Sequence, residues 1–360
     1  MNDCVNWCQS KIRSKAMAPA ILNCTFPVHT GPLTFTEEEQ QSVNSLHAQV
    51  PALIESLEGI VSEAERHLLL AWATKATAHR YLIATKWKLE SAAAKLKATL
   101  QWRNEFKPSE IPAEEVEPEA VCGKGFVSGF DKHGRPILYG IGRLDNTKTW
   151  DRSLRFSFYL IEKAIRLMPE GVEKLTIVLD NNGIGLMNSP PVSFMLSFVA
   201  ITEKHYPERL GCAILSSPSW YVWGLYNIVA PFLDPVIKAK IYFAKFGRDE
   251  ASVAPTVEQD QASKPQSSGW SSYLGLREKQ PAANTEADNS KTVAGSVWGA
   301  VFGSSGADAK STDNTENTAG TGGWTDILTL IDADQLPVAF GGAHDFEYEH
   351  ATYWRAIDAV

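Results

Sequence analysis

Residues 205–215 read HYPERLGCAIL, and this stretch decides how the surrounding chain folds. Its second half, residues 212–215, is an unbroken apolar run, which predicts a short buried strand. Its first half places an acid and a base, Glu208 and Arg209, side by side at the entry to that strand. Taken alone, such a pair is as typical of a cap at the end of a strand as it is of a binding site.

Similar short apolar runs recur on both sides of this stretch and alternate with helical patterns. The predicted strands are 125–130, 136–142, 175–179, 212–215 and 241–243, and the predicted helices are about 151–168, 191–205 and 220–234. The first two strands flank a turn at residues 131–135. Strands that alternate with helices indicate an α/β fold with a mainly parallel sheet.

The region before the first strand has the periodicity of helices. Residues 37–106 are predicted to be helical, most clearly from residue 89 to residue 106. Apolar residues recur there close to helical spacing at Leu89, Ala93, Leu96, Leu100 and Phe106. Pro108 ends this helix, and Pro112 and Pro118 predict that the acidic link after it is extended.

Composition divides the chain into five regions. Residues 248–323 are rich in Ser, Gly, Ala, Thr, Asn, Asp and Gln, and such a segment buries too little apolar surface to offset the entropy lost on ordering. The predicted regions are a disordered N-terminus (1–35), a helical module (36–110), an α/β domain (111–247), a disordered insertion (248–323) and a C-terminal segment that packs back on the α/β domain (324–360).

Charge and cysteine content restrict the function and the compartment. The net charge of -8 argues against nucleic-acid binding, and the acidity lies in the C-terminal third, because residues 1–247 hold 27 Lys and Arg against 25 Asp and Glu. Five cysteines without a C-x-x-C pair fit the reducing cytosol. Residues 210–233 are uncharged and long enough to cross a bilayer, but Pro218 and Pro231 favour a strand, a turn and a helix there.

The motifs of common enzymes are absent from the sequence. No P-loop, dinucleotide fingerprint, G-x-S-x-G elbow or H-E-x-x-H motif occurs. His344 and His350 lie among acidic residues and offer an alternative as metal ligands, but a charged surface is the simpler interpretation. We therefore predict no catalytic residues, no metal and no cofactor; the chain is not expected to be an enzyme.

Several segments together resemble the CRAL-TRIO lipid-binding family, and specifically its phosphatidylinositol-transfer branch. The N-terminal module of that family is similar to YLIATKW (81–87) and LQWRNEF (100–106). Its lipid-binding domain is similar to DKHGRP (131–136), HYPERLG (205–211) and PFLDP (231–235), and its closing segment to LPVAFGG (336–342) with Tyr353 and Trp354. The resemblance covers roughly residues 65–247 and 330–355 and is specific because the motifs keep their order and spacing.

The resemblance implies a sheet with flanking helices around an apolar lipid cavity, closed by a mobile lid helix at about 223–240. The apolar lid residues would be Trp223, Leu225, Ile228, Val229, Phe232 and Leu233. The resemblance also implies that Glu208, Arg209 and Lys240 hold the lipid headgroup. Ile83 and Ile237 depart from the family pattern, because they replace an arginine and a threonine that donate hydrogen bonds.

The function implied is that of a cytoplasmic carrier, with a bound phospholipid as its ligand. Phosphatidylinositol is the first choice of cargo, and a sterol or a phospholipid with another headgroup is the alternative. Membrane surfaces would be transient partners and lipid-modifying enzymes possible ones. Two other functions stay open: a lipid sensor that regulates a partner without net transfer, and a catalytic α/β protein.

Overall fold

The computed structural model describes most of the chain outside the N-terminus and the predicted insertion. The described residues are 19–28, 35–59, 61–145, 147–185, 189–216, 220–246 and 323–360. They all belong to one compact unit. Of the segments predicted to be disordered, residues 19–28, 35 and 323 are described, and the prediction for the remaining residues of 1–35 and 248–323 lies outside the described part of the chain.

The first part of the fold is a group of helices. They are α2 (Glu37–Glu55), α3 (Glu63–Trp72), α4 (Lys75–Ala84), α5 (Leu89–Phe106) and the short 3-10 helix η1 (Pro108–Glu110). Thr36 with Glu39 caps α2, and Ser62 with Glu65 caps α3; in each capping box a hydroxyl and a carboxylate satisfy free backbone N–H groups. The helices bury a shared apolar core that includes Leu46, Leu82, Leu96 and Leu100.

The second part is a six-stranded sheet in the order β1 to β6. Its strands are β1 (Gly125–Phe130), β2 (Pro136–Ile141), β3 (Leu175–Asp180), β4 (Leu210–Ser216), β5 (Ile241–Ala244) and β6 (Gly323–Trp324). Only the pair β1–β2 is antiparallel, and all later neighbours are parallel. The predicted mainly parallel α/β sheet with an N-terminal helical module is confirmed.

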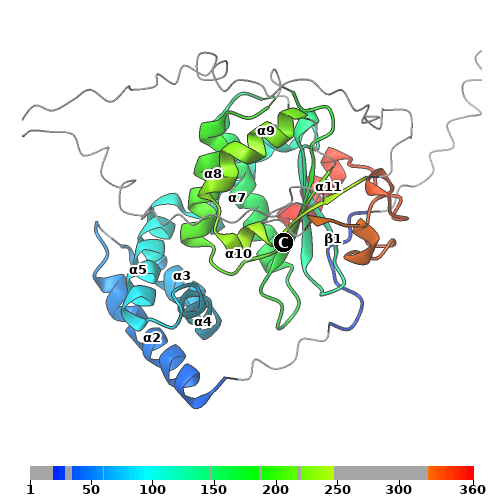
Figure 1. The fold of residues 1–360 in the computed structure, drawn as a ribbon. Coiled ribbons are helices and arrows are strands. Elements are labelled where there is room, and N and C mark those ends of the chain that lie inside the picture. Colours follow the sequence, from blue (N-terminus) through cyan, green and yellow to red (C-terminus); the bar gives the residue numbers. More distant parts are fainter. Residues whose placement is uncertain are drawn as a thin grey trace, which may run out of the picture. The chain divides into compact units, whose positions relative to one another are not determined.

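Helices and a C-terminal segment cover the two faces of the sheet. The remaining elements are α6 (Ala113–Ala120), η2 (Gly142–Leu144), α7 (Trp150–Arg166), α8 (Val192–His205), α9 (Trp220–Val229), η3 (Ala230–Phe232), α10 (Pro235–Lys238), η4 (Ile327–Thr329), η5 (Val338–Phe340) and α11 (His350–Asp358). Figure 1 shows α8 and α9, in green to yellow-green, on one side of the sheet and the C-terminal segment, in orange to red, on the other. On that second side, Phe340 packs on Tyr139 of β2.

The acidic link after Pro108 is helical, so the prediction of an extended link was wrong. It forms α6 with Pro118 inside it, although a proline removes one hydrogen bond of a helix. Tertiary packing offsets that loss, because Val116 is fully buried and Glu119 is buried against α7. There Glu119 Oε1 accepts a hydrogen bond from Arg152 Nε at 2.6 Å. In α6, the burial of Val116 and Glu119 therefore outweighs the low helix propensity of Pro118.

The outer edge of β1 is covered by segments from both ends of the chain. Gly129 N donates to the carbonyl oxygen of Ile21 at 2.8 Å, and Val127 N donates to the hydroxyl of Tyr353 at 2.6 Å. An edge strand with unpaired N–H groups tends to pair with other molecules. These two contacts satisfy such groups within the chain.

A buried ionic contact joins the helical group to the sheet. Arg103 of α5 donates two hydrogen bonds to Glu162 of α7, at 2.9 and 3.1 Å, and Tyr206 donates a third at 2.7 Å. Next to it, the ring of His205 stacks on Trp102 with the ring centroids 4.4 Å apart. The carbonyl and the imidazole of His205 also bond to side chains of α4 and α5.

We expect His205 to make stability depend on pH. Burial, followed by the positive charges of Lys204, Lys95 and Arg103, lowers the pKa of His205 from 6.5 to about 3. Between those values the unfolded chain binds the proton and the folded chain does not, so stability falls as the pH drops from 6.5 toward 3. Between pH 7 and pH 5, wild type should lose about 2 kcal/mol more unfolding free energy than His205→Asn.

Urea titrations of both proteins at the two pH values measure this difference. Asparagine keeps a polar group for Thr99 but has no ionisable ring, so any general loss of packing affects both pH values alike. Equal pH dependence of wild type and variant contradicts a buried neutral imidazole.

Candidate functional site

The predicted headgroup residues lie where the parallel strands begin. Glu208 and Arg209 precede β4, and Lys240 directly precedes β5. Lys174 stands in the corresponding place before β3, the other neighbour of β4. Because neighbouring parallel strands start at the same edge of a sheet, these four residues share one edge.

Glu208 has a strained backbone. It follows Pro207 in a turn that is closed by a hydrogen bond from Arg209 N to the carbonyl oxygen of Tyr206, at 3.3 Å. Its φ is +56°, a left-handed value that is uncommon for any residue except glycine. Such strain tends to persist at functional sites, where the direction of one side chain matters more than local stability.

The carboxylate of Glu208 lies between two lysines. Its Oε2 atom is 3.6 Å from Lys174 Nζ and 3.9 Å from Lys240 Nζ. Burial lowers the pKa of Lys240, with Glu208 acting in the opposite direction and Lys174 in the same direction. The structure therefore brings together Glu208 and Lys240, both predicted, with Lys174, which sequence analysis did not select.

Arg209 points away from this group. Its Nη1 atom donates to the carbonyl oxygen of Glu173 at 2.7 Å, and Arg80 of α4 pairs with the carboxylate of the same Glu173 at 3.1 Å. Burial lowers the pKa of Arg209 to about 10. Its contacts support the junction between α4 and the start of β3, and the structure does not place it beside Glu208 and Lys240.

A further half-buried lysine faces the same region from α5. The ammonium group of Lys95 forms no hydrogen bond or ion pair with any described residue, and burial lowers its pKa. The acids that act on it through space include Glu203 and Asp234. Glu203 accepts a hydrogen bond from Asp234 N at 3.2 Å, and the Asp234 carboxylate in turn caps α10.

The two isoleucines that depart from the family pattern lie at the borders of this region. Ile83 is near the end of α4 and is 38% exposed. Ile237 is half-buried in α10, where its carbonyl oxygen accepts the hydrogen bond of Lys240 N at 3.0 Å. Neither side chain offers a hydrogen bond to a ligand.

The two faces of the central strands differ in burial. On the face toward the C-terminal segment, Val178 and Ile214 are fully buried. On the opposite face, toward α8 and α9, Ile177, Leu179 and Leu215 remain partly accessible to solvent. Central strands of a covered parallel sheet are normally buried on both faces. Their partial exposure shows that the covering helices pack loosely on this face.

The helices over this face are apolar and only partly buried as well. The half-buried apolar side chains of α8 are Val192, Phe194, Met195, Leu196, Phe198, Val199 and Ile201. In α8 only His205, at the carboxyl end, is buried. Apolar side chains thus lie on both sides of the layer between the sheet and α8.

The predicted lid is divided into α9, η3 and α10. Trp223 packs against Phe243 of β5, with the ring centroids 4.8 Å apart, and Leu233 joins the same cluster. Leu225 and Val229 are half-buried. Ile228 and Phe232 are 36% and 38% exposed. Pro231 lies in the 3-10 turn that follows α9, as expected of a bend in the segment.

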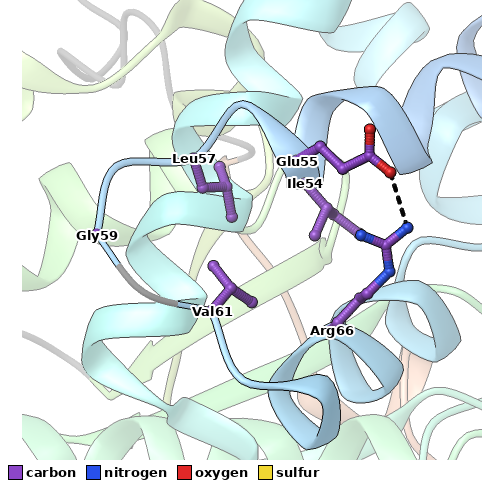
Figure 2. Close-up of a pocket in the computed structure, with 6 residues that line it drawn as sticks. All are labelled: Ile54, Glu55, Leu57, Gly59, Val61 and Arg66. Carbon is purple, nitrogen blue, oxygen red and sulfur yellow. Dashed lines mark hydrogen bonds and ion pairs between the residues drawn. The ribbon is translucent and has the colours of Figure 1, made fainter.

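A separate pocket of about 170 Å³ lies in the helical group, far along the chain from the lysines. Figure 2 shows Ile54, Leu57 and Val61 on its walls and the ion pair of Arg66 with Glu55, 3.0 Å long, at its rim. Pockets for drug-sized ligands measure about 300–1,000 Å³. This pocket is too small for a two-chain lipid.

The described parts of the chain hold no cluster of three or more His, Cys, Asp or Glu side chains suited to a metal ion. Within the same residues, no helix is both long enough and apolar enough to cross a membrane.

Residues 120–265 match the family model of the CRAL/TRIO domain. A CRAL-TRIO domain-containing protein of Schizosaccharomyces pombe is 36% identical over 172 residues, which cover 48% of this chain and 17% of that protein. Together with the fold, these findings confirm the resemblance seen in the sequence. Residues 120–265 of this chain are thus similar to the CRAL/TRIO domain.

Two further relatives are named for lipid transfer. Phosphatidylinositol transfer protein PDR17 of Saccharomyces cerevisiae is 34% identical over 184 residues, which cover 48% of this chain and 53% of that protein. Phosphatidylinositol transfer protein CSR1 of Eremothecium gossypii is 32% identical over 192 residues, covering 49% and 43%. The matched region spans about half the length of these relatives, or less.

The strain at Glu208 gives a prediction about stability. Glycine adopts a φ of +56° without strain, whereas alanine does not. We therefore expect Glu208→Gly to unfold with a free energy about 1 kcal/mol higher than Glu208→Ala. Both variants lose the carboxylate, so only the backbone distinguishes them.

Chemical denaturation at pH 7 measures the two free energies. Alanine is normally the more stabilising of the two residues, because glycine has more freedom to lose on folding. If Glu208→Ala proved equal to or more stable than Glu208→Gly, the left-handed conformation would not be strained as described.

Proposed function

We propose that this chain binds one phospholipid and carries it between membranes, with phosphatidylinositol as the first candidate. The acyl chains would lie between β3–β4 and the helices α8 and α9, and the headgroup would meet Glu208 and Lys240. The observation that supports this most is the unequal burial of the central strands. Ile177, Leu179 and Leu215 stay partly exposed under a cover of apolar helices.

The physical chemistry of such a site suits a carrier. Each lipid methylene that leaves water gains about 0.8 kcal/mol, and it gains this in a protein as in a bilayer. Transfer then needs a way to open the site more than a strong chemical driving force. In our proposal α9, η3 and α10 form the part that opens, and the exposure of Ile228 and Phe232 places apolar groups where they can meet a membrane surface.

The names of the relatives support the choice of cargo. PDR17 and CSR1 are named phosphatidylinositol transfer proteins, and each is similar to this chain over about half of its length. We propose the same activity for this chain, without a catalytic step. We also propose a cytoplasmic location, transient membrane contact and delivery of lipid to lipid-modifying enzymes.

The headgroup assignment predicts that Lys240→Ala lowers phosphatidylinositol transfer by about tenfold or more. The reason is that a hydrogen bond to a charged group contributes about 1.5–3 kcal/mol. The fold should persist, because the carbonyl of Lys240 still accepts the hydrogen bond of Ala213 N. Transfer of labelled phosphatidylinositol between vesicles measures the effect.

Lys148→Ala is the matched control. Lys148 is exposed and follows β2 in the loop at the opposite edge of the sheet, so its removal changes the net charge equally. We expect normal transfer from this variant. Unchanged transfer by a folded Lys240→Ala protein would rule out the headgroup assignment.

A further inference from the structure

Lys174 has no part in the headgroup pattern predicted from the sequence, yet it occupies the same site. Its Nζ atom and that of Lys240 approach the same oxygen atom of Glu208, from the starts of the two strands that flank β4. The side chains of Lys174 and Lys240 are 43% and 22% exposed. The three charged groups therefore form one cluster that solvent can reach.

The contacts within this cluster are loose. Distances of 3.6 and 3.9 Å exceed those of a charged N–H···O hydrogen bond, about 2.7–2.9 Å. Each ammonium group carries three donors, so both lysines keep donors for a ligand. The strained turn at Glu208 holds the carboxylate between the lysines and does not bring it against either one.

The cluster also has an excess of positive charge, because the other nearby carboxylates, those of Asp131 and Asp234, form hydrogen bonds with other groups. Asp131 accepts a 2.7 Å bond from Arg135 Nε and another from Thr176. Asp234 caps α10. Two lysines thus share one free carboxylate, which leaves one positive charge for an anionic ligand.

We propose that Lys174 is a second headgroup ligand, which forms with Lys240 a two-lysine clamp for a lipid phosphate. The inference rests on the proposed function and deepens it. A clamp with excess positive charge favours headgroups whose only charge is the phosphate, such as phosphatidylinositol. It disfavours phosphatidylcholine, because the choline cation is repelled by the same two ammonium groups.

The clamp takes over the role of the donors missing at Ile83 and Ile237. Both of those side chains are apolar, so neither can donate a hydrogen bond to a headgroup phosphate. Lys174 supplies a cation from the residue just before β3, away from the two helices that carry the isoleucines. Selectivity for anionic headgroups then depends on Lys174 more than on α4 or α10.

The test compares transfer of phosphatidylinositol and phosphatidylcholine by Lys174→Ala, Lys174→Arg and the control Lys148→Ala. We expect the ratio of the two transfer rates to fall about tenfold in Lys174→Ala, mainly through slower phosphatidylinositol transfer. Lys174→Arg keeps the charge and should retain most of the ratio. Lys148→Ala should leave it unchanged.

The outcomes separate this inference from the proposed function. If wild type transfers phosphatidylinositol and Lys174→Ala keeps the wild-type ratio, the clamp is overturned and the carrier function stands. If wild type transfers neither lipid, the function itself fails. Inorganic phosphate gives a third outcome. If its binding requires Lys174 while Lys174→Ala leaves the ratio of the two lipid transfer rates unchanged, the cluster binds a free anion and Lys174 is not a headgroup ligand.

Discussion

The buried contact of Arg103 with Glu162 and Tyr206 fixes the geometry on which the candidate site depends. It ties α5 to α7 and to the corner between α8 and β4. Removing one partner of such a pair leaves an uncompensated buried charge, which costs about 3–5 kcal/mol. Because Tyr206 begins the turn that holds Glu208, this contact also sets the position of the carboxylate between its two lysines. The same contact therefore supports both the stability of the fold and the position of Glu208 in the candidate site.

The rest of the sheet divides into a tightly and a loosely packed side. The C-terminal segment covers a face that is mostly buried, as Phe340 and Tyr139 illustrate, whereas α8 and α9 leave Ile177 and Leu215 partly exposed on theirs. Stability within a protein is uneven, and the elements that move are those with few buried contacts. The charged cluster lies at the amino ends of the strands, so it borders the loose side without depending on it for its position.

Much of this arrangement follows from local patterns in the sequence. Apolar runs located β3, β4 and β5, and the turn around Glu208 marked the start of β4. Local patterns failed at α6, where burial of Val116 outweighed the effect of Pro118. They also missed Lys174, because its proximity to Glu208 depends on the pairing of β3 with β4. Loose packing over one face has no sequence signal, since the same apolar residues serve a filled core equally well.

The central claim is that lipid chains occupy the layer between β3–β4 and the helices α8 and α9. Photo-crosslinking tests it most directly, with a phosphatidylinositol that carries a reactive group at the end of one acyl chain. Mass spectrometry of the peptides should then find labels on residues of β3, β4, α8 or α9, at most one per chain. Labels confined to the helical group around Leu57, or no labelling above that of an unrelated protein, would contradict the claim.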